Sequence, residues 1–115
     1  MNHYALIFRM DILTASAQPS PEEMRRYMES WMRWTDSIDA EGRLEGGNHF
    51  SPSGWVLRQG GARSDLPYAA QNESVAGYLL IRAPNDSEAL RIAQACPILE
   101  GQGTSVEVRE LASPR

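Results

Sequence analysis

The second half of the chain reads Ser64-Asp65-Leu66-Pro67-Tyr68, then a polar link, then Val75-Ala76-Gly77-Tyr78-Leu79-Leu80-Ile81-Arg82. The last of these stretches alternates in character with the period of a β-strand, which we expect over residues 75–83. One face of this strand is apolar and holds Val75, Leu79, Ile81 and Ala83 beside Gly77. The other face is mixed and holds Ala76, Tyr78, Leu80 and Arg82. The alternation predicts a sheet with a hydrophobic core on one side.

A capped helix and a closing strand follow this segment. Asn85 can cap the helix, with Glu88 three residues later, and Pro97 ends it. The closing strand is expected over residues 104–110, with its valines on one side and its charged residues on the other.

The first half of the chain predicts another strand and a longer helix. Residues 3–10 alternate between apolar and mixed positions, as a half-buried strand does. Ser20, Pro21 and Glu23 then form the signature of a helix start, because serine caps, proline fits the first turn and glutamate completes a capping box. Gly42 is typical of the position just after a helix.

Two shorter strands are expected in the middle, over residues 43–49 and 55–58. The intervening Ser51-Pro52-Ser53-Gly54 has turn chemistry, which favours pairing of these two strands as a hairpin. Residues 60–74 show no period, and a connection of that length in a small domain is usually functional, mobile or both.

The element order is therefore β-α-β-β-β-α-β in a single domain over residues 1–115. Each helix must bury an apolar stripe, so we predict an α+β, ferredoxin-like layer: an antiparallel-rich sheet with both helices on one face. The opposite sheet face is too apolar for water and too charged for a dry core. It carries Ala5, Ile7, Tyr78 and Leu80 beside Arg9, Arg82, Glu107 and Arg109. A homodimer formed through this face would resolve the conflict.

Composition excludes several partners. The 115 residues carry a net charge of −4 with basic residues scattered along the chain, which argues against a nucleic-acid groove. Cys96 is the single cysteine, so no internal disulfide can form, and no apolar run is long enough to span a bilayer. We expect a soluble cytoplasmic protein.

Four segments in order resemble the YCII-related proteins, and more narrowly the branch with an Asp-Gly-Pro-Phe corner. They are Glu41-Gly42-Arg43-Leu44-Glu45-Gly46-Gly47, Asp65-Leu66-Pro67-Tyr68, Gly77-Tyr78-Leu79-Leu80-Ile81 and Val106-Glu107-Val108-Arg109. The resemblance implies a ferredoxin-like fold assembled as a dimeric α/β barrel. The corner departs from the branch pattern, with Leu66 in place of glycine and Tyr68 in place of phenylalanine.

A dehydrochlorinase related to this family implies acid–base chemistry by a His–Asp pair, with the histidine on the first helix. At about that place this chain has Trp31, and the expected helix contains no histidine. The first candidate catalytic residue is instead His49, which closes a Gly-Gly-Asn-His-Phe segment. Histidine side chains can exchange protons near neutral pH, and Asp65 can orient one. The alternatives stay open that His49 merely ends a strand and that Asp65 accepts backbone N–H bonds in a turn.

Arg9 and Arg82, on the mixed sheet face, can hold a small anionic ligand through bidentate hydrogen bonds, with Tyr68 and Tyr78 as further ligand-binding candidates. The rival role for the arginines is pairing with Glu107 inside a dimer. Two histidines and one cysteine are too few for a metal site, and no glycine-rich loop has a phosphate-binding setting, so we expect no metal or cofactor.

Two classes of function follow. In the first, the protein is a lyase or isomerase that works on a small molecule by proton transfer in a pocket at the dimer. In the second, it is a non-catalytic dimer that binds a small ligand or regulates a partner. The fold alone does not decide between them, because function belongs to the site.

Overall fold

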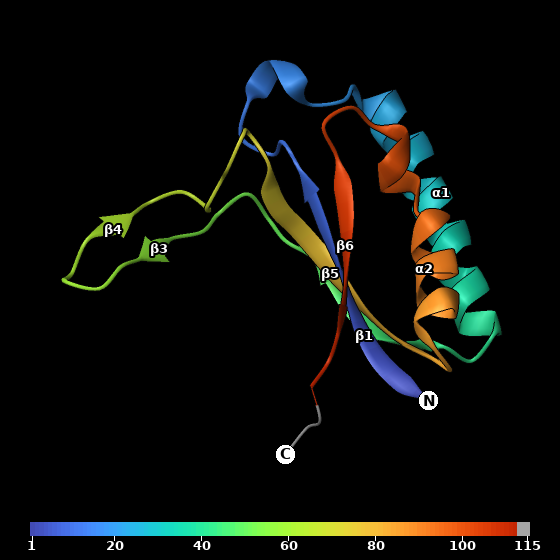
Figure 1. Cartoon of the computed structure of the whole chain (residues 1–115). Coiled ribbons are helices and arrows are strands. Elements are labelled where there is room, and N and C mark those ends of the chain that lie inside the picture. The colour runs from blue at the N-terminus through green and yellow to red at the C-terminus, as the bar shows by residue number, and fades with distance from the viewer. Residues whose placement is uncertain (113–115) are drawn as a thin grey trace.

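Four antiparallel strands form one sheet, and both α-helices lie on the same face of it (Figure 1). The computed structural model describes residues 1–112. The elements are β1 (Asn2–Met10), η1 (Ala15–Ala17), α1 (Pro21–Ala40), β2 (Leu44–His49), β3 (Val56–Leu57), β4 (Arg63–Ser64), β5 (Ser74–Ala83), α2 (Asp86–Gln94), η2 (Pro97–Glu100) and β6 (Ser105–Glu110). The main sheet has the order β2-β5-β1-β6, which confirms the predicted ferredoxin-like α+β fold.

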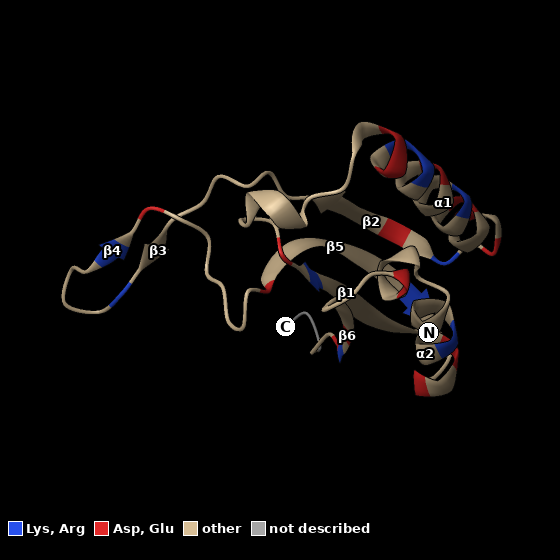
Figure 2. Ribbon diagram, turned by 90° about the horizontal axis from the view of Figure 1, so that it is seen from above, with Lys and Arg blue, Asp and Glu red and all other residues tan. Residues whose placement is uncertain are grey.

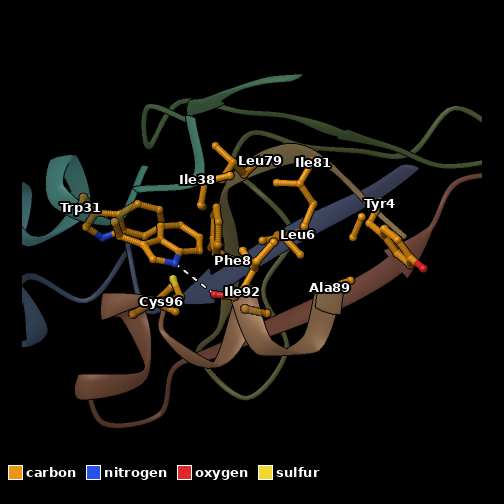
Figure 3. Packing of buried hydrophobic residues seen from close by; sticks show 14 residues of the cluster. Tyr4, Leu6, Phe8, Trp31, Ile38, Leu79, Ile81, Ala89, Ile92 and Cys96 are labelled. Atoms are coloured by element: carbon orange, nitrogen blue, oxygen red, sulfur yellow. Dashed lines mark hydrogen bonds between the residues drawn. The ribbon is translucent and has the colours of Figure 1, made fainter. Parts of the chain in front are cut away.

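The core lies between this sheet and the helices, on the face that the alternation predicted. Tyr4, Leu6 and Phe8 of β1 are buried, and so are Leu79, Ile81 and Ala83 of β5. The register places Leu6 opposite Leu79 and also opposite Val108 of β6. Figure 3 shows these side chains meeting Ile92 and Ala89 of α2. The opposite face of the sheet has no layer of its own chain over it (Figure 1).

Both helices begin at the predicted caps. The Ser20 hydroxyl accepts a hydrogen bond from the Glu23 amide at 3.1 Å, and the Glu23 carboxylate accepts one from the Ser20 amide at 3.0 Å. At the start of α2, the Asn85 side chain accepts a bond from the Glu88 amide at 3.0 Å. The capping bond from Ser20 holds the pKa of Glu23 below its usual value, because it stabilises the charged carboxylate.

The lowered pKa of Glu23 makes the stability of α1 depend on pH. We expect Glu23→Gln to destabilise the protein near neutral pH, because the neutral amide is a weaker cap. A depressed carboxyl pKa contributes stability above the unfolded value of 4.5, and this contribution is lost as pH falls through the folded value. Urea unfolding of the variant and of wild type should therefore differ at about pH 7 and converge toward about pH 2. Glu22→Gln, in the same first turn but outside the capping box, is the control and should show a smaller pH-dependent difference.

The predicted pairing of residues 43–49 with 55–58 is wrong. β2 pairs with β5, and β3 instead pairs with β4 in a separate two-stranded hairpin. The glycines explain the difference. A Cβ on Gly47 would lie 2.5 Å from the Tyr78 carbonyl oxygen, so β2 sits as close to β5 as only glycine allows. Gly60 and Gly61, with φ of +90° and +94°, form the turn of the β3–β4 hairpin, because this left-handed backbone favours glycine.

Residues 51–70 carry this hairpin away from the sheet, on the side opposite the helices (Figures 1 and 2). We call this segment the arm. It contains the region expected to be one irregular connection, which is instead a turn and a short strand that return the chain to β5. Within residues 1–112, no helix is both long enough and apolar enough to cross a membrane.

Candidate functional site

His49 lies at the end of β2, opposite Gly77 of β5. A Cβ on Gly77 would lie 2.7 Å from the Asn48 carbonyl oxygen, so the missing side chain lets the end of β2 approach the sheet closely. The imidazole then meets the edge of Trp31 from α1, with ring centroids 5.1 Å apart and planes at 76°. This edge-to-face packing fixes the imidazole beside the aromatic end of the core.

Two pockets meet at these rings. The smaller, of about 240 Å³, is lined by Phe8, Trp31, Thr35, Gly47, Asn48, His49, Tyr78 and Leu79. The larger, of about 350 Å³, shares Phe8, Trp31 and His49 and adds mainly apolar side chains, among them Met24, Met28 and Phe50. We call the two together the His49 pocket. Its walls are aromatic and thioether-rich, which suits a flat apolar molecule.

Trp31 contributes its indole ring to both halves of the pocket. The residue is 5% exposed, and its indole nitrogen has no hydrogen-bond partner among residues 1–112. Trp34, by contrast, donates its indole N–H to the Ile92 carbonyl at 3.1 Å, and Figure 3 shows Trp31 at the outer edge of the same core. Burial raises the pKa of the neighbouring Tyr27 phenol, whose ring lies 5.9 Å from that of Trp31 without a hydrogen bond that joins them. An unpaired buried donor costs about 1–3 kcal/mol, which a ligand oxygen can recover.

Tyr78 is the sequence-predicted ligand residue that shares this pocket with His49. Its ring lies 5.7 Å from that of Phe50, which itself lines the larger half of the pocket. The structure therefore brings together one of the two candidate catalytic residues and one of the four candidate ligand residues.

Arg9 and Tyr68 meet in a different place. They line a pocket of about 470 Å³ between the base of the arm and the end of the sheet, which we call the root pocket. Arg9 donates a hydrogen bond to the Glu107 carboxylate at 2.7 Å, and this bond lowers the pKa of Glu107. Arg9 therefore pairs with Glu107 within one chain. This pairing is the role that the sequence left open as the alternative to ligand binding.

Asp65 and Arg82 lie outside both pockets. Asp65 is on the arm, where its exposed carboxylate accepts a hydrogen bond from Arg63 at 2.9 Å. Arg82 donates to the Gly42 carbonyl at 2.9 Å and lies four residues along β5 from Tyr78, about 13 Å at the rise of a strand. A single chain does not bring His49, Asp65 and Arg82 into one site.

Trp31 lines the His49 pocket, but sequence reasoning did not select it as a site residue. Its spacing on α1 marked it only as an aromatic at the place where a related enzyme carries a histidine, and an unpaired donor leaves no signal in a sequence. Cys96 is unsuited to nucleophilic chemistry, because burial raises its pKa to about 12. Across residues 1–112, no three His, Cys, Asp or Glu side chains gather closely enough to hold a metal ion.

The arrangement can hold a small flat ring against the aromatic side chains of Trp31 and His49, on the helix side of the sheet. The His49 imidazole can give or take a proton there, which is the elementary step of general acid–base chemistry.

Comparison with known proteins identifies relatives. One solved structure that the comparison matches is a 5-chloro-2-hydroxyhydroquinone dehydrochlorinase from Burkholderia phenoliruptrix, in complex with 2,5-dihydroxybenzoquinone. It is 16% identical, the alignment covers 90% of each chain, and the TM-score is 0.45. No curated protein sequence matches significantly. The family model of the YCII-related domain matches residues 8–112. Since this match spans nearly the whole chain, the protein belongs to the YCII-related family.

Proposed function

We propose that the protein binds a hydroxylated one-ring aromatic molecule in the His49 pocket and acts on it as a lyase or isomerase. One observation carries the proposal: the His49 imidazole and the Trp31 indole ring line the same aromatic pocket, and the buried N–H of that indole has no hydrogen-bond partner among residues 1–112. Aromatic walls select a flat ring, and the buried donor selects a ring that carries an oxygen. A phenol, or its phenolate anion, satisfies both requirements.

In the proposed reaction, the Trp31 N–H orients the substrate oxygen, and His49 removes a proton from the substrate. In a lyase, the electron pair left by that proton forms a new double bond as a neighbouring group leaves with its bonding pair. In an isomerase, the protonated imidazole returns the proton to another atom of the same molecule. Both reactions need only a positioned base, so no cofactor is invoked.

The site belongs to a homodimer in this proposal. Ala5, Ile7, Tyr78 and Leu80 lie on the sheet face that neither helix covers, and Tyr78 of that face also lines the His49 pocket. A second copy packed on this face would therefore border the pocket. A free cysteine that is buried and unpaired suits a reducing compartment, and the proposal places the dimer in the cytoplasm.

The second candidate function is a non-catalytic dimer that binds the same class of molecule. The lining of the His49 pocket favours it, since neither half of that lining includes an acidic residue to orient the imidazole. Without such an orienting group, the pocket can bind a ring and transfer no proton at a useful rate.

The experiment is an absorbance assay on a panel of phenols and catechols that carry a leaving group on the ring. Turnover by wild type that disappears in His49→Gln and persists in His3→Gln supports the enzyme. His3 is the matched control, because it is the other histidine and is held by Glu45 at 2.6 Å, away from the pocket. Saturable binding of the panel without turnover supports the binding protein, and no binding at all contradicts both.

A further inference from the structure

The arm projects away from the sheet and the helices (Figure 1). Its two strands, β3 and β4, are two residues each and pair only with one another. A two-stranded hairpin of this kind is marginal in water unless something packs on it. The radius of gyration of the whole molecule is 15.4 Å, whereas a compact chain of this length would have roughly 13 Å. The projecting arm explains this larger radius of gyration. It also leaves the surface of the arm free to contact another molecule.

Large apolar side chains stand exposed along the arm. The exposed fractions are 64% for Trp55, 76% for Leu57, 60% for Leu66 and 62% for Tyr68. Single exposed apolar residues are ordinary on protein surfaces, but a run of them on one short hairpin marks an interaction surface.

The same chain carries a pocket that such side chains fit. The root pocket, of about 470 Å³, has a largely apolar wall that includes Phe50, Trp55, Val56 and Pro67. Leu57 lies in β3, shortly before the Gly60–Gly61 turn, and does not line the root pocket, which extends along the arm from the sheet as far as Val56. An arm cannot fold its outer end back into its own base. Two arms that lie antiparallel can fill each other's pockets.

Charge follows the same arrangement. Arg58 lies near the outer end of the arm and makes no ion pair among residues 1–112, whereas Arg63 of β4 is paired with Asp65. The root pocket contains the carboxylate of Glu73, and its basic residue, Arg9, is already paired with Glu107. A basic outer end facing an acidic base is complementary between two antiparallel copies.

We propose that the arm is exchanged between two copies of the chain, so that Leu57 of each copy enters the root pocket of the other. The contact is self-complementary, as a twofold axis requires. The arm leaves the sheet on the side opposite the helices, so it reaches across a second copy that packs on that sheet face (Figure 1). This inference goes beyond the proposed function, and it holds whether or not His49 transfers a proton.

Disulfide trapping between two singly substituted chains tests the contact. Leu57→Cys and Ser53→Cys chains, with different tags, are co-expressed and oxidised, since Ser53 lines the root pocket. The exchanged arms predict a mixed disulfide between the two kinds of chain, because their Cα atoms would come within about 7 Å. The buried thiol of Cys96 does not compete, given its raised pKa. The control pair is Leu57→Cys with Leu90→Cys, an exposed position on α2, and should give no mixed disulfide.

A second measurement keeps the outcome independent of trapping efficiency. Sedimentation on dilution should show that Leu57→Arg raises the dimer dissociation constant at least about tenfold, while Leu90→Arg leaves it unchanged. Absence of the mixed disulfide together with wild-type dissociation of Leu57→Arg would overturn the exchange. A dimer that is lost with a sheet-face substitution but kept with Leu57→Arg would likewise exclude the arm contact. Neither result would touch the chemistry proposed for His49.

Discussion

Replacing His49 with glutamine should lower kcat/KM by about 10²–10⁴-fold on any substrate that the assay identifies, because this range is the usual contribution of a positioned acid or base. Glutamine keeps a polar side chain of similar reach at the end of β2 but cannot take up a proton. The change should fall mainly on kcat, since the other aromatic side chains of the pocket, Phe8 and Trp31, remain to bind the ring.

Two further variants serve as controls for the loss of activity expected in His49→Gln. His3→Gln should retain wild-type kcat/KM, because His3 pairs with Glu45 outside the pocket. Asp65→Asn should also have a kcat/KM near that of wild type if the only role of Asp65 is to pair with Arg63. A His49→Gln enzyme with undiminished kcat would show that the proton is moved by another group, and the acid–base role of His49 would have to be abandoned.

Leu80→Asp should convert the dimer into a monomer. Leu80 lies on the uncovered sheet face, directly opposite Ala5 of β1, at the centre of the proposed interface. A carboxylate buried in the apolar centre of that interface costs about 3–5 kcal/mol and weakens association by roughly 10²–10⁴-fold. Light scattering at tens of micromolar, a range in which we expect wild type to be dimeric, should give the monomer mass.

Leu90→Asp is the matched control, because Leu90 is an exposed leucine on α2 on the other side of the molecule. Circular dichroism should show that both variants keep the fold, since neither side chain belongs to the buried core. A monomeric wild type, or a Leu80→Asp protein that stays dimeric, would contradict the sheet-face interface.

Local patterns were enough to predict the fold. The alternation of β5 identified which side chains face the core, and Ser20, Glu23 and Asn85 identified where the helices begin. Long-range pairing was not predictable in the same way. Gly46 and Gly47 are typical of loops, yet both lie in β2, and the missing side chain of Gly47 is what lets that strand approach β5. The turn chemistry before Gly54 likewise leads the chain into the arm rather than closing a hairpin.

The site was predicted only in part for the same reason. His49 and Tyr78 lie on paired strands of one sheet, so their proximity follows from the register. Asp65 was grouped with His49 because both are titratable residues near the expected long connection, but the β3–β4 hairpin carries Asp65 onto the arm. The unpaired indole N–H of Trp31 was not predicted. Whether a buried N–H has a hydrogen-bond partner depends on details of packing that cannot be read from a sequence.

The indole N–H signals of the tryptophans test the central claim most directly. The chain has three, at Trp31, Trp34 and Trp55, which occupy the His49 pocket, the core and the root pocket. In a ¹H–¹⁵N spectrum titrated with catechol, the Trp31 signal should shift as its N–H gains a partner, while Trp34, already bonded to Ile92, and Trp55 should stay in place. Tryptophan-to-phenylalanine variants assign the signals. A shift of Trp55 alone, or no shift at Trp31 at saturating catechol, would contradict the His49 pocket as the ligand site.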